Sequence, residues 1–243
     1  MKVAIIGMTM PVIYDEIENI IEVDPSMDIT DLVAGAANVC YNPIAIGQIF
    51  DNLTSEKRAK LIDRTLNDRH MSIYEHVSFN FAISGVSRAL LAQLTRHRIA
   101  SFSVQSQRYC KLTEPDYITP DSIMNHPEAL SEYDGLMELI WETYNQLVDS
   151  GIPKEDARMV LPNACTTQLI MTMNIRELFH FFKLRMCKHA QWEIQELATR
   201  IFEQVEITAP HIFSYVNKQC AHEKCYDACG GCVIRQCVNL KRV

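Results

Sequence analysis

Residues 96–109 carry a dense set of side chains that can bind an anion. Three arginines, one histidine and three serines fall within these fourteen positions. The planar guanidinium of Arg meets phosphate oxygens bidentately, and Ser and Gln donate hydrogen bonds to phosphate or to the edge of a base. The segment therefore predicts a site for a small anionic ligand. The alternative is a solvated helix end, where basic side chains interact favourably with the helix dipole.

Charge and glycine content restrict how that anion is held. The formal net charge is −7, which argues against a general nucleic-acid binder, although the arginines collect in the middle of the chain. The chain has only eight glycines, and they form neither a GxGxxG nor a GxxxxGK(S/T) pattern. Side chains rather than a glycine-rich loop are therefore expected to hold any phosphate.

Length and composition fit one large domain, or one domain with a small appendage. The chain has 243 residues, of which 48% are hydrophobic and 22% are charged. It contains no apolar run of about 18 residues, so no membrane-spanning helix is expected. The first residues, MKVAIIGM, are more typical of a buried strand than of a signal peptide, and the expected location is the cytoplasm.

The elements that must position residues 96–109 form a mixture of helices and strands without strict alternation, which indicates the α+β class. Strands are expected at residues 2–6, 76–84 and 168–173. Helices are expected at residues 29–38, 43–50, 54–67, 86–98, 129–150 and 192–205, and after Asn174, which can cap its helix. Residues 1–216 form the expected main domain, and the cysteine-rich residues 217–243 form a separate tail.

Local details of this pattern bear on the site. Gly85 is expected to end the strand at 76–84, so that the next helix delivers Arg96 and Arg98 near its C-terminus. A polar segment follows as far as Tyr109. The helix at 129–150 is expected to turn its apolar side chains inward, namely Leu130, Leu136, Leu139, Ile140 and Leu147.

The order Arg96, His97, Arg98, seven further residues, Ser106 and then Arg108 resembles the signature of the flavin-dependent thymidylate synthases. Segments on both sides are similar to the same family in the same order. They are HMSIYEH at 70–76, Gln93, ARMVLP at 157–162, NIREL at 174–178, Leu184 with Arg185, and HAQWEIQ at 189–195. The resemblance spans roughly residues 30–215, and the ordered segments make it specific.

The resemblance implies an α+β fold with mixed helices around a small antiparallel sheet. It also implies an enzyme that moves a one-carbon unit from methylenetetrahydrofolate to dUMP and reduces it to the methyl group of dTMP. FAD, reduced by NADPH, would supply the hydride, so no cysteine nucleophile is needed. All four ligands are anions, which fits an arginine-lined pocket. The family forms homotetramers with active sites shared between subunits, and neither nucleic acid nor a membrane is an expected partner.

Roles for individual residues follow from the same resemblance. The expected flavin contacts are His70, Ser72, Arg96, His97, Arg98, Asn174, Arg176 and His180. The expected dUMP contacts are Gln93, Ser106, Gln107, Arg108, Arg158 and Arg185. Catalytic roles fall to Arg185, which would polarise the uracil ring, and to Ser106, as a substrate-binding hydroxyl rather than a nucleophile.

Taken one at a time, some of these residues also have plain structural roles. His70 can be a turn histidine, and Asn174 can be a helix cap and nothing more. Arg158 can be the ion-pair partner of Glu155 on one helix. Only the joint order of the segments favours the functional interpretation.

Four positions depart from the family pattern. Ser103 and Val104 stand where the family usually has Asn-Glu. Gln107 stands where Gly is common, and His180 stands where some members have Asn. These departures imply altered affinity, a shifted substrate or low activity, so a divergent and weakly active member is an alternative to the full enzyme.

Five of the nine cysteines lie in the C-terminal tail. Cys225, Cys229, Cys232 and Cys237 offer four ligands for a structural zinc ion, and Cys229-Gly-Gly-Cys232 has the spacing of a zinc knuckle. Because a second pair with this spacing is missing, a redox pair, an iron–sulfur cluster or free thiols are alternatives. A nucleotide-binding protein with a zinc-knuckle tail is therefore the alternative of a different functional class.

Overall fold

The computed structural model describes residues 1–11, 13–14, 21–22 and 27–216. The expected tail at 217–243, with the candidate zinc ligands Cys225, Cys229, Cys232 and Cys237, lies outside the described residues. Among the helices that the structure describes, none is both long enough and apolar enough to cross a membrane.

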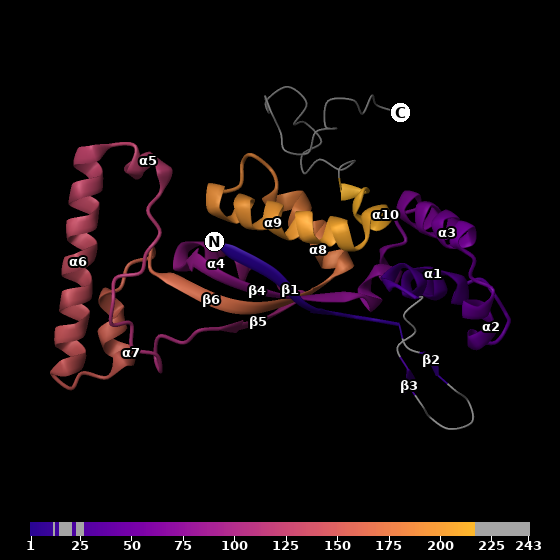
Figure 1. The fold of residues 1–243 in the computed structure, drawn as a ribbon, viewed down its shortest axis with the longest axis horizontal. Coiled ribbons are helices and arrows are strands. Elements are labelled where there is room, and N and C mark those ends of the chain that lie inside the picture. Colours follow the sequence, from indigo (N-terminus) through magenta and orange to yellow (C-terminus); the bar gives the residue numbers. More distant parts are fainter. Residues whose placement is uncertain (12, 15–20, 23–26, 217–243) are drawn as a thin grey trace. The chain divides into compact units, whose positions relative to one another are not determined.

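A four-stranded sheet runs through the described chain, with strand order β1-β4-β6-β5 (Figure 1). Its strands are β1 (Lys2–Met8), β4 (Ser78–Ser87), β5 (Ala100–Val104) and β6 (Thr166–Asn174). A separate antiparallel pair joins β2 (Ile13–Tyr14) to β3 (Ile21–Glu22). With the helices given below, these strands confirm the expected α+β class.

β4 and β6 are antiparallel neighbours at the centre of the sheet. Just before β4 begins, Val77 O accepts a hydrogen bond from Ile175 N, which follows the end of β6. At the other end of the pair, Arg88 N follows β4 and donates to Cys165 O just before β6 begins. This register fixes where each strand passes into the helix that follows it.

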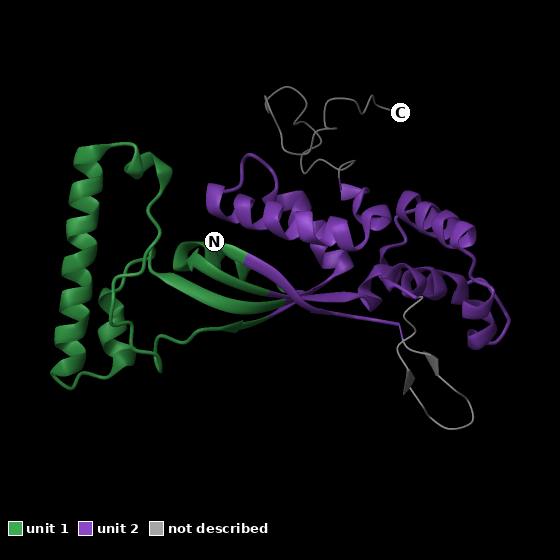
Figure 2. Ribbon diagram, viewed as in Figure 1, with its two compact units in different colours: residues 1–2, 82–98, 102–171 green, residues 3–81, 99–101, 172–243 purple. Residues whose placement is uncertain are grey.

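The chain divides into two compact units, and the division falls within β4 and within β6 (Figure 2). Unit 1 consists of residues 1–2, 82–98 and 102–171, and unit 2 consists of the described residues within 3–81, 99–101 and 172–216. The helices of unit 1 are α4 (Arg88–Leu94), α5 (Asp121–Met124), α6 (Pro127–Asp149), α7 (Lys154–Ala157) and the 3₁₀ helix η2 (Arg158–Val160). Those of unit 2 are α1 (Ile29–Val39), α2 (Ile46–Asp51), α3 (Ser55–Asn67), the 3₁₀ helix η1 (Met71–His76), α8 (Ile175–Arg185), α9 (Trp192–Thr208) and α10 (Pro210–Phe213).

Unit 2 is built around aromatic side chains. Alternation along β4 buries Phe79 and Phe81 on one face of the strand, and α8 buries Phe181 and Phe182. Phe213 of α10 packs edge-on against Phe79 and Phe182, with ring centroids 6.1 and 6.2 Å apart. Edge-to-face pairs of this kind contribute about 0.5–1.5 kcal/mol beyond the burial of area. This core ties α8, which carries several predicted site residues, to β4 and α10.

Unit 1 has a smaller core centred on Trp141 of α6. Met137, Trp141 and Cys165 are buried together, and Tyr117 and Tyr133 pack against them. The rings of Tyr117 and Tyr133 meet edge-on, with centroids 5.7 Å apart. Because the Cys165 carbonyl also accepts a hydrogen bond from Arg88 N, this core is linked to the start of α4.

The structure corrects the expected end of the strand at 76–84. β4 continues through Gly85, whose φ is +66°, and ends only at Ser87. Ser87 Oγ then accepts a hydrogen bond from Leu90 N and caps α4. α4 ends at Leu94, so Arg98 lies in the segment after the helix rather than in its last turn.

Two other features differ from expectation. Residues 100–104, expected only as part of a polar segment, form the strand β5. Leu136 and Leu139 were expected to face inward but are 52% and 56% exposed. The larger side chains of Trp141 and Tyr144 occupy the buried side of α6 instead, and they bury more apolar area there.

Gly85 and Gly135 provide a matched test of backbone strain in unit 1. Gly85→Ala should lower the free energy of unfolding by about 1 kcal/mol, because a Cβ is unfavourable at φ +66°. Gly135 lies in α6, where an added Cβ meets no atom within 4 Å. Gly135→Ala should therefore raise the free energy of unfolding by about 0.5–1 kcal/mol. Chemical denaturation measures both shifts, and shifts of the same sign would contradict the strain argument.

Candidate functional site

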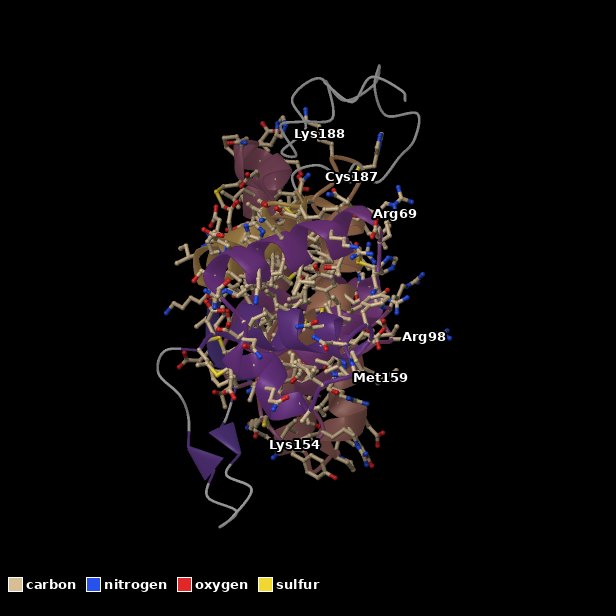
Figure 3. All side chains as sticks on the ribbon, turned by 90° about the vertical axis from the view of Figure 1, so that its right-hand side faces the viewer. Arg69, Arg98, Lys154, Met159, Cys187 and Lys188 are labelled. Atoms are coloured by element: carbon tan, nitrogen blue, oxygen red, sulfur yellow. The ribbon has the colours of Figure 1, made fainter. Side chains whose placement is uncertain are left out.

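α4 and the turn after it carry the first group of predicted site residues. Gln93 is half-buried near the end of α4. His97 N donates to Leu94 O at 3.1 Å and closes the turn, and the His97 side chain is only 4% exposed. Arg96 and Arg98 are exposed, and the Arg98 side chain extends away from the ribbon (Figure 3). The turn thus buries one imidazole and leaves two guanidinium groups in solvent.

Arg108 and Arg158 meet at a single glutamate. Arg108 Nε and Nη2 each lie 2.7 Å from Glu155 Oε2. Arg158 Nε donates to the backbone carbonyl of Glu155 at 3.1 Å. The Glu155 carboxylate therefore pairs with Arg108 and not with Arg158, the partner that the local spacing suggests. The structure brings two of the arginines expected at dUMP to one residue of α7.

Ser106 and Gln107 lie in the turn that presents Arg108. Ser106 Oγ accepts from Arg108 N at 3.2 Å, and Ser106 O accepts from Cys110 N at 3.0 Å. Gln107 Nε2 donates to Cys165 Sγ at 3.4 Å. Ser106 therefore shapes the turn, whereas the Gln107 amide is directed at a buried thiol.

Arg88 and Cys165 adjoin this cluster, and neither of them belongs to a motif that predicts a site residue. Arg88 Nη2 donates to Gln105 O at 2.9 Å, and Arg88 Nε is buried with no hydrogen-bond partner among the described residues. Burial lowers the pKa of the Arg88 guanidinium. Burial raises the pKa of the Cys165 thiol, although the Arg88 charge and the Gln107 hydrogen bond act in the opposite direction. No local pattern distinguished either residue, because both contacts join distant segments.

The N-terminus of α8 carries two predicted site residues in unit 2. Asn174 Oδ1 accepts from Glu177 N at 2.9 Å, so the expected helix cap is confirmed. Arg176 forms an ion pair with Glu75 of η1, and both side chains are about half exposed. The helix is eleven residues long and directs the positive end of its dipole here. A bound anion at Asn174 and Arg176 would therefore be stabilised.

His70 lines a pocket of about 310 Å³ in unit 2. Its ring meets Tyr41 edge-on, with centroids 6.4 Å apart, and the Arg64 guanidinium lies 5.7 Å from the centre of the same Tyr41 ring. Ser72, which the resemblance also assigns to the flavin, is exposed on η1. The other lining residues are Ala37, Leu61, Thr65 and Asp68. This lining suits a ligand that has both a ring and polar edges.

Other predicted positions lie further along α8 and on β5. His180 is exposed in the middle of α8, and Arg185 is half-buried in its last turn. Ser103 and Val104 alternate on β5, with Ser103 exposed and Val104 half-buried. Val104 therefore places an aliphatic group where the family pattern has an acidic one.

The predicted residues divide between the two units. Unit 1 holds Gln93, Arg96, His97, Arg98, Ser106, Gln107, Arg108 and Arg158. Unit 2 holds His70, Ser72, Asn174, Arg176, His180 and Arg185. Most of the expected dUMP contacts thus belong to unit 1, and most of the expected flavin contacts belong to unit 2.

Comparison with known proteins identifies one family over most of the chain. Residues 23–211 match the family model described as thymidylate synthase complementing protein. A flavin-dependent thymidylate synthase of Geobacter sulfurreducens is 40% identical over 213 residues, which cover 87% of this chain and 91% of that protein. For that of Clostridium tetani the identity is 39% over 217 residues, with 83% and 87% covered. For that of Pyrococcus furiosus it is 41% over 179 residues, with 72% and 73% covered. The chain therefore belongs to the flavin-dependent thymidylate synthase family.

Proposed function

We propose that this chain converts dUMP to dTMP by reductive methylation, with methylenetetrahydrofolate as the one-carbon donor and FAD as the redox cofactor. The observation that carries the proposal is the family match over residues 23–211. NADPH is the proposed reductant and the cytoplasm the proposed location. The proposed assembly is a homotetramer whose active sites are shared between subunits.

Unit 1 supplies the proposed site for the dUMP phosphate. Arg108 and Arg158 bring two guanidinium groups to Glu155, and the fork of each group matches phosphate oxygens. Ser106 supports the turn that carries Arg108 and can donate its hydroxyl to the substrate. Gln93 is the other proposed side-chain contact. The proposed contribution of Gln107 runs through its backbone, because its amide bonds to a thiol.

The described groups near the proposed dUMP site suit polarisation of the uracil better than covalent attack by the Cys165 thiol. Arg185 is half-buried, so its charge is screened less than that of an exposed arginine. We assign it the polarisation of the uracil ring. A thiolate rather than a thiol is the nucleophile, and the raised pKa of Cys165 keeps that sulfur protonated. Reduced flavin, when bound, supplies the hydride.

The proposed flavin contacts fit a dinucleotide with charged phosphates. Arg96 and Arg98 are exposed and have no ion-pair partner among the described residues. Asn174 and Arg176 lie at the positive end of α8. We assign His97 and His180 to the same ligand, and His70 with Ser72 to its other end, because the His70 pocket offers ring and polar contacts.

A visible spectrum with metal analysis of the purified protein tests the two proposed prosthetic groups. The protein should be yellow, or should take up FAD on titration. Protein that is colourless and binds no FAD would refute the proposed function. Stoichiometric zinc would support a structural site at Cys225, Cys229, Cys232 and Cys237, and protein without metal would refute it.

Asn174 allows the helix cap to be separated from flavin binding. Asn174→Ala removes the cap and should lower the free energy of unfolding by about 1 kcal/mol. It should also weaken FAD binding, because the proposed contact is lost. Asn174→Asp keeps a capping oxygen but adds a negative charge beside the flavin phosphates. It should therefore melt like the wild type and bind FAD more weakly, as measured by thermal denaturation and fluorescence titration. Unchanged FAD affinity in Asn174→Asp would contradict the proposed flavin contact and would show that Asn174 only caps the helix.

A divergent, weakly active enzyme is the second candidate, and Val104 is the observation that favours it. The proposal predicts slow release of tritium from 5-tritiated dUMP. Val104→Glu restores the acidic side chain of the family pattern at the end of β5 and should raise the release rate. Val104→Gln, which has the same length without the charge, is the control. An unchanged rate in Val104→Glu would argue against this candidate.

A further inference from the structure

Glu155 engages both arginines that are proposed to hold the dUMP phosphate. Its Oε2 atom lies 2.7 Å from Arg108 Nε and 2.7 Å from Arg108 Nη2. Its backbone carbonyl accepts from Arg158 Nε at 3.1 Å. A carboxylate thus already occupies one edge of the Arg108 guanidinium, and phosphate oxygens bind to guanidinium edges of this kind.

The exposure of this ion pair shows that it is weak. Arg108 is 53% exposed and Glu155 is 48% exposed. Solvent screens the attraction between such side chains, and both lose rotamer freedom when they pair. A phosphate monoester carries more negative charge than a carboxylate at neutral pH and forms charge-assisted, bidentate bonds with Arg. A phosphate is therefore expected to displace the carboxylate.

We propose that Glu155 is a specificity residue that competes with the 5′-phosphate of dUMP for Arg108. This rests on the proposed role of Arg108 in dUMP binding. In the absence of substrate the Glu155 carboxylate neutralises the guanidinium. A phosphate dianion replaces it, whereas a nucleoside without phosphate does not. Glu155 therefore weakens the binding of every anion at Arg108 and reserves the site for a dianion.

Release of Arg108 requires only a rotation of the Glu155 side chain. Lys154, on the same helix, donates from Nζ to Tyr109 O at 2.8 Å, so the turn that carries Arg108 stays attached to α7 when the carboxylate leaves. The bond from Arg158 goes to the Glu155 backbone and does not depend on the side chain. A substitution at Glu155 therefore changes the Arg108 contact and preserves the others.

Glu155→Gln in the FAD-loaded full chain tests this competition, because Gln keeps the size of the side chain and removes its charge. The dissociation constant of radiolabelled dUMP in equilibrium dialysis should fall about two- to fivefold, the range that exposed ion pairs span. The constant for deoxyuridine should not change, since deoxyuridine has no phosphate. Asp156→Asn is the matched control, because it removes the same charge from an exposed neighbour on α7 and should leave both constants unchanged.

Arg108→Gln separates failure of this inference from failure of the proposed function. If Arg108→Gln weakens dUMP binding while Glu155→Gln fails to tighten it, the competition is overturned and the phosphate role of Arg108 stands. If Arg108→Gln leaves dUMP binding unchanged, both are overturned. Equal tightening by Asp156→Asn, or tighter binding of deoxyuridine to Glu155→Gln, would also overturn the competition, because a general change of charge or structure would then explain the result.

Discussion

The antiparallel pairing of β4 with β6 is the constraint on which the rest of the site depends. β4 passes into α4 and β6 passes into α8, so one register decides where both helices begin. Backbone bonds at Arg88 and Ile175 hold the two ends of that register. Ser87 and Asn174 then cap the helices at their first turns. The junction of β6 with α8 thus supplies Asn174 and Arg176, and side chains elsewhere supply the other anion-binding groups in a chain whose glycines cannot form a phosphate loop.

Much of this arrangement could be predicted from the sequence because its signals are local. The alternation of β4 and the cap at Asn174 depend on residues a few positions apart. The end of β4 could not be predicted, since Gly85 is a typical breaker and only pairing with neighbouring strands keeps the chain extended beyond it. The sequence also could not predict which side chains of α6 are buried. Apolar residues cover a wide arc of that helix, and tertiary packing favoured Trp141 over Leu136 and Leu139.

The contacts of Glu155 show the same limit within the candidate site. Helical spacing suggested Arg158 as its ion-pair partner, whereas the carboxylate binds Arg108, which is 47 residues away in sequence. The bond from Gln107 to Cys165 spans 58 residues and is equally invisible to local patterns. The family motif could name Arg108 but not the acid that pairs with it. Because both partners are about half exposed, this ion pair contributes little to the stability of the fold, and its main effect falls on the ligand site at Arg108.

The effect of Val104 on activity is limited, because the protein and the cofactor have different roles in the reaction. The cofactor carries the redox chemistry, so the protein contributes charge and position rather than a nucleophile. The neutral, buried Cys165 is consistent with that division. Val104 removes one acidic group from the edge strand β5 but leaves every arginine of the motif in place. Its effect therefore falls on how the ligands are positioned, and the charges that attract them are retained.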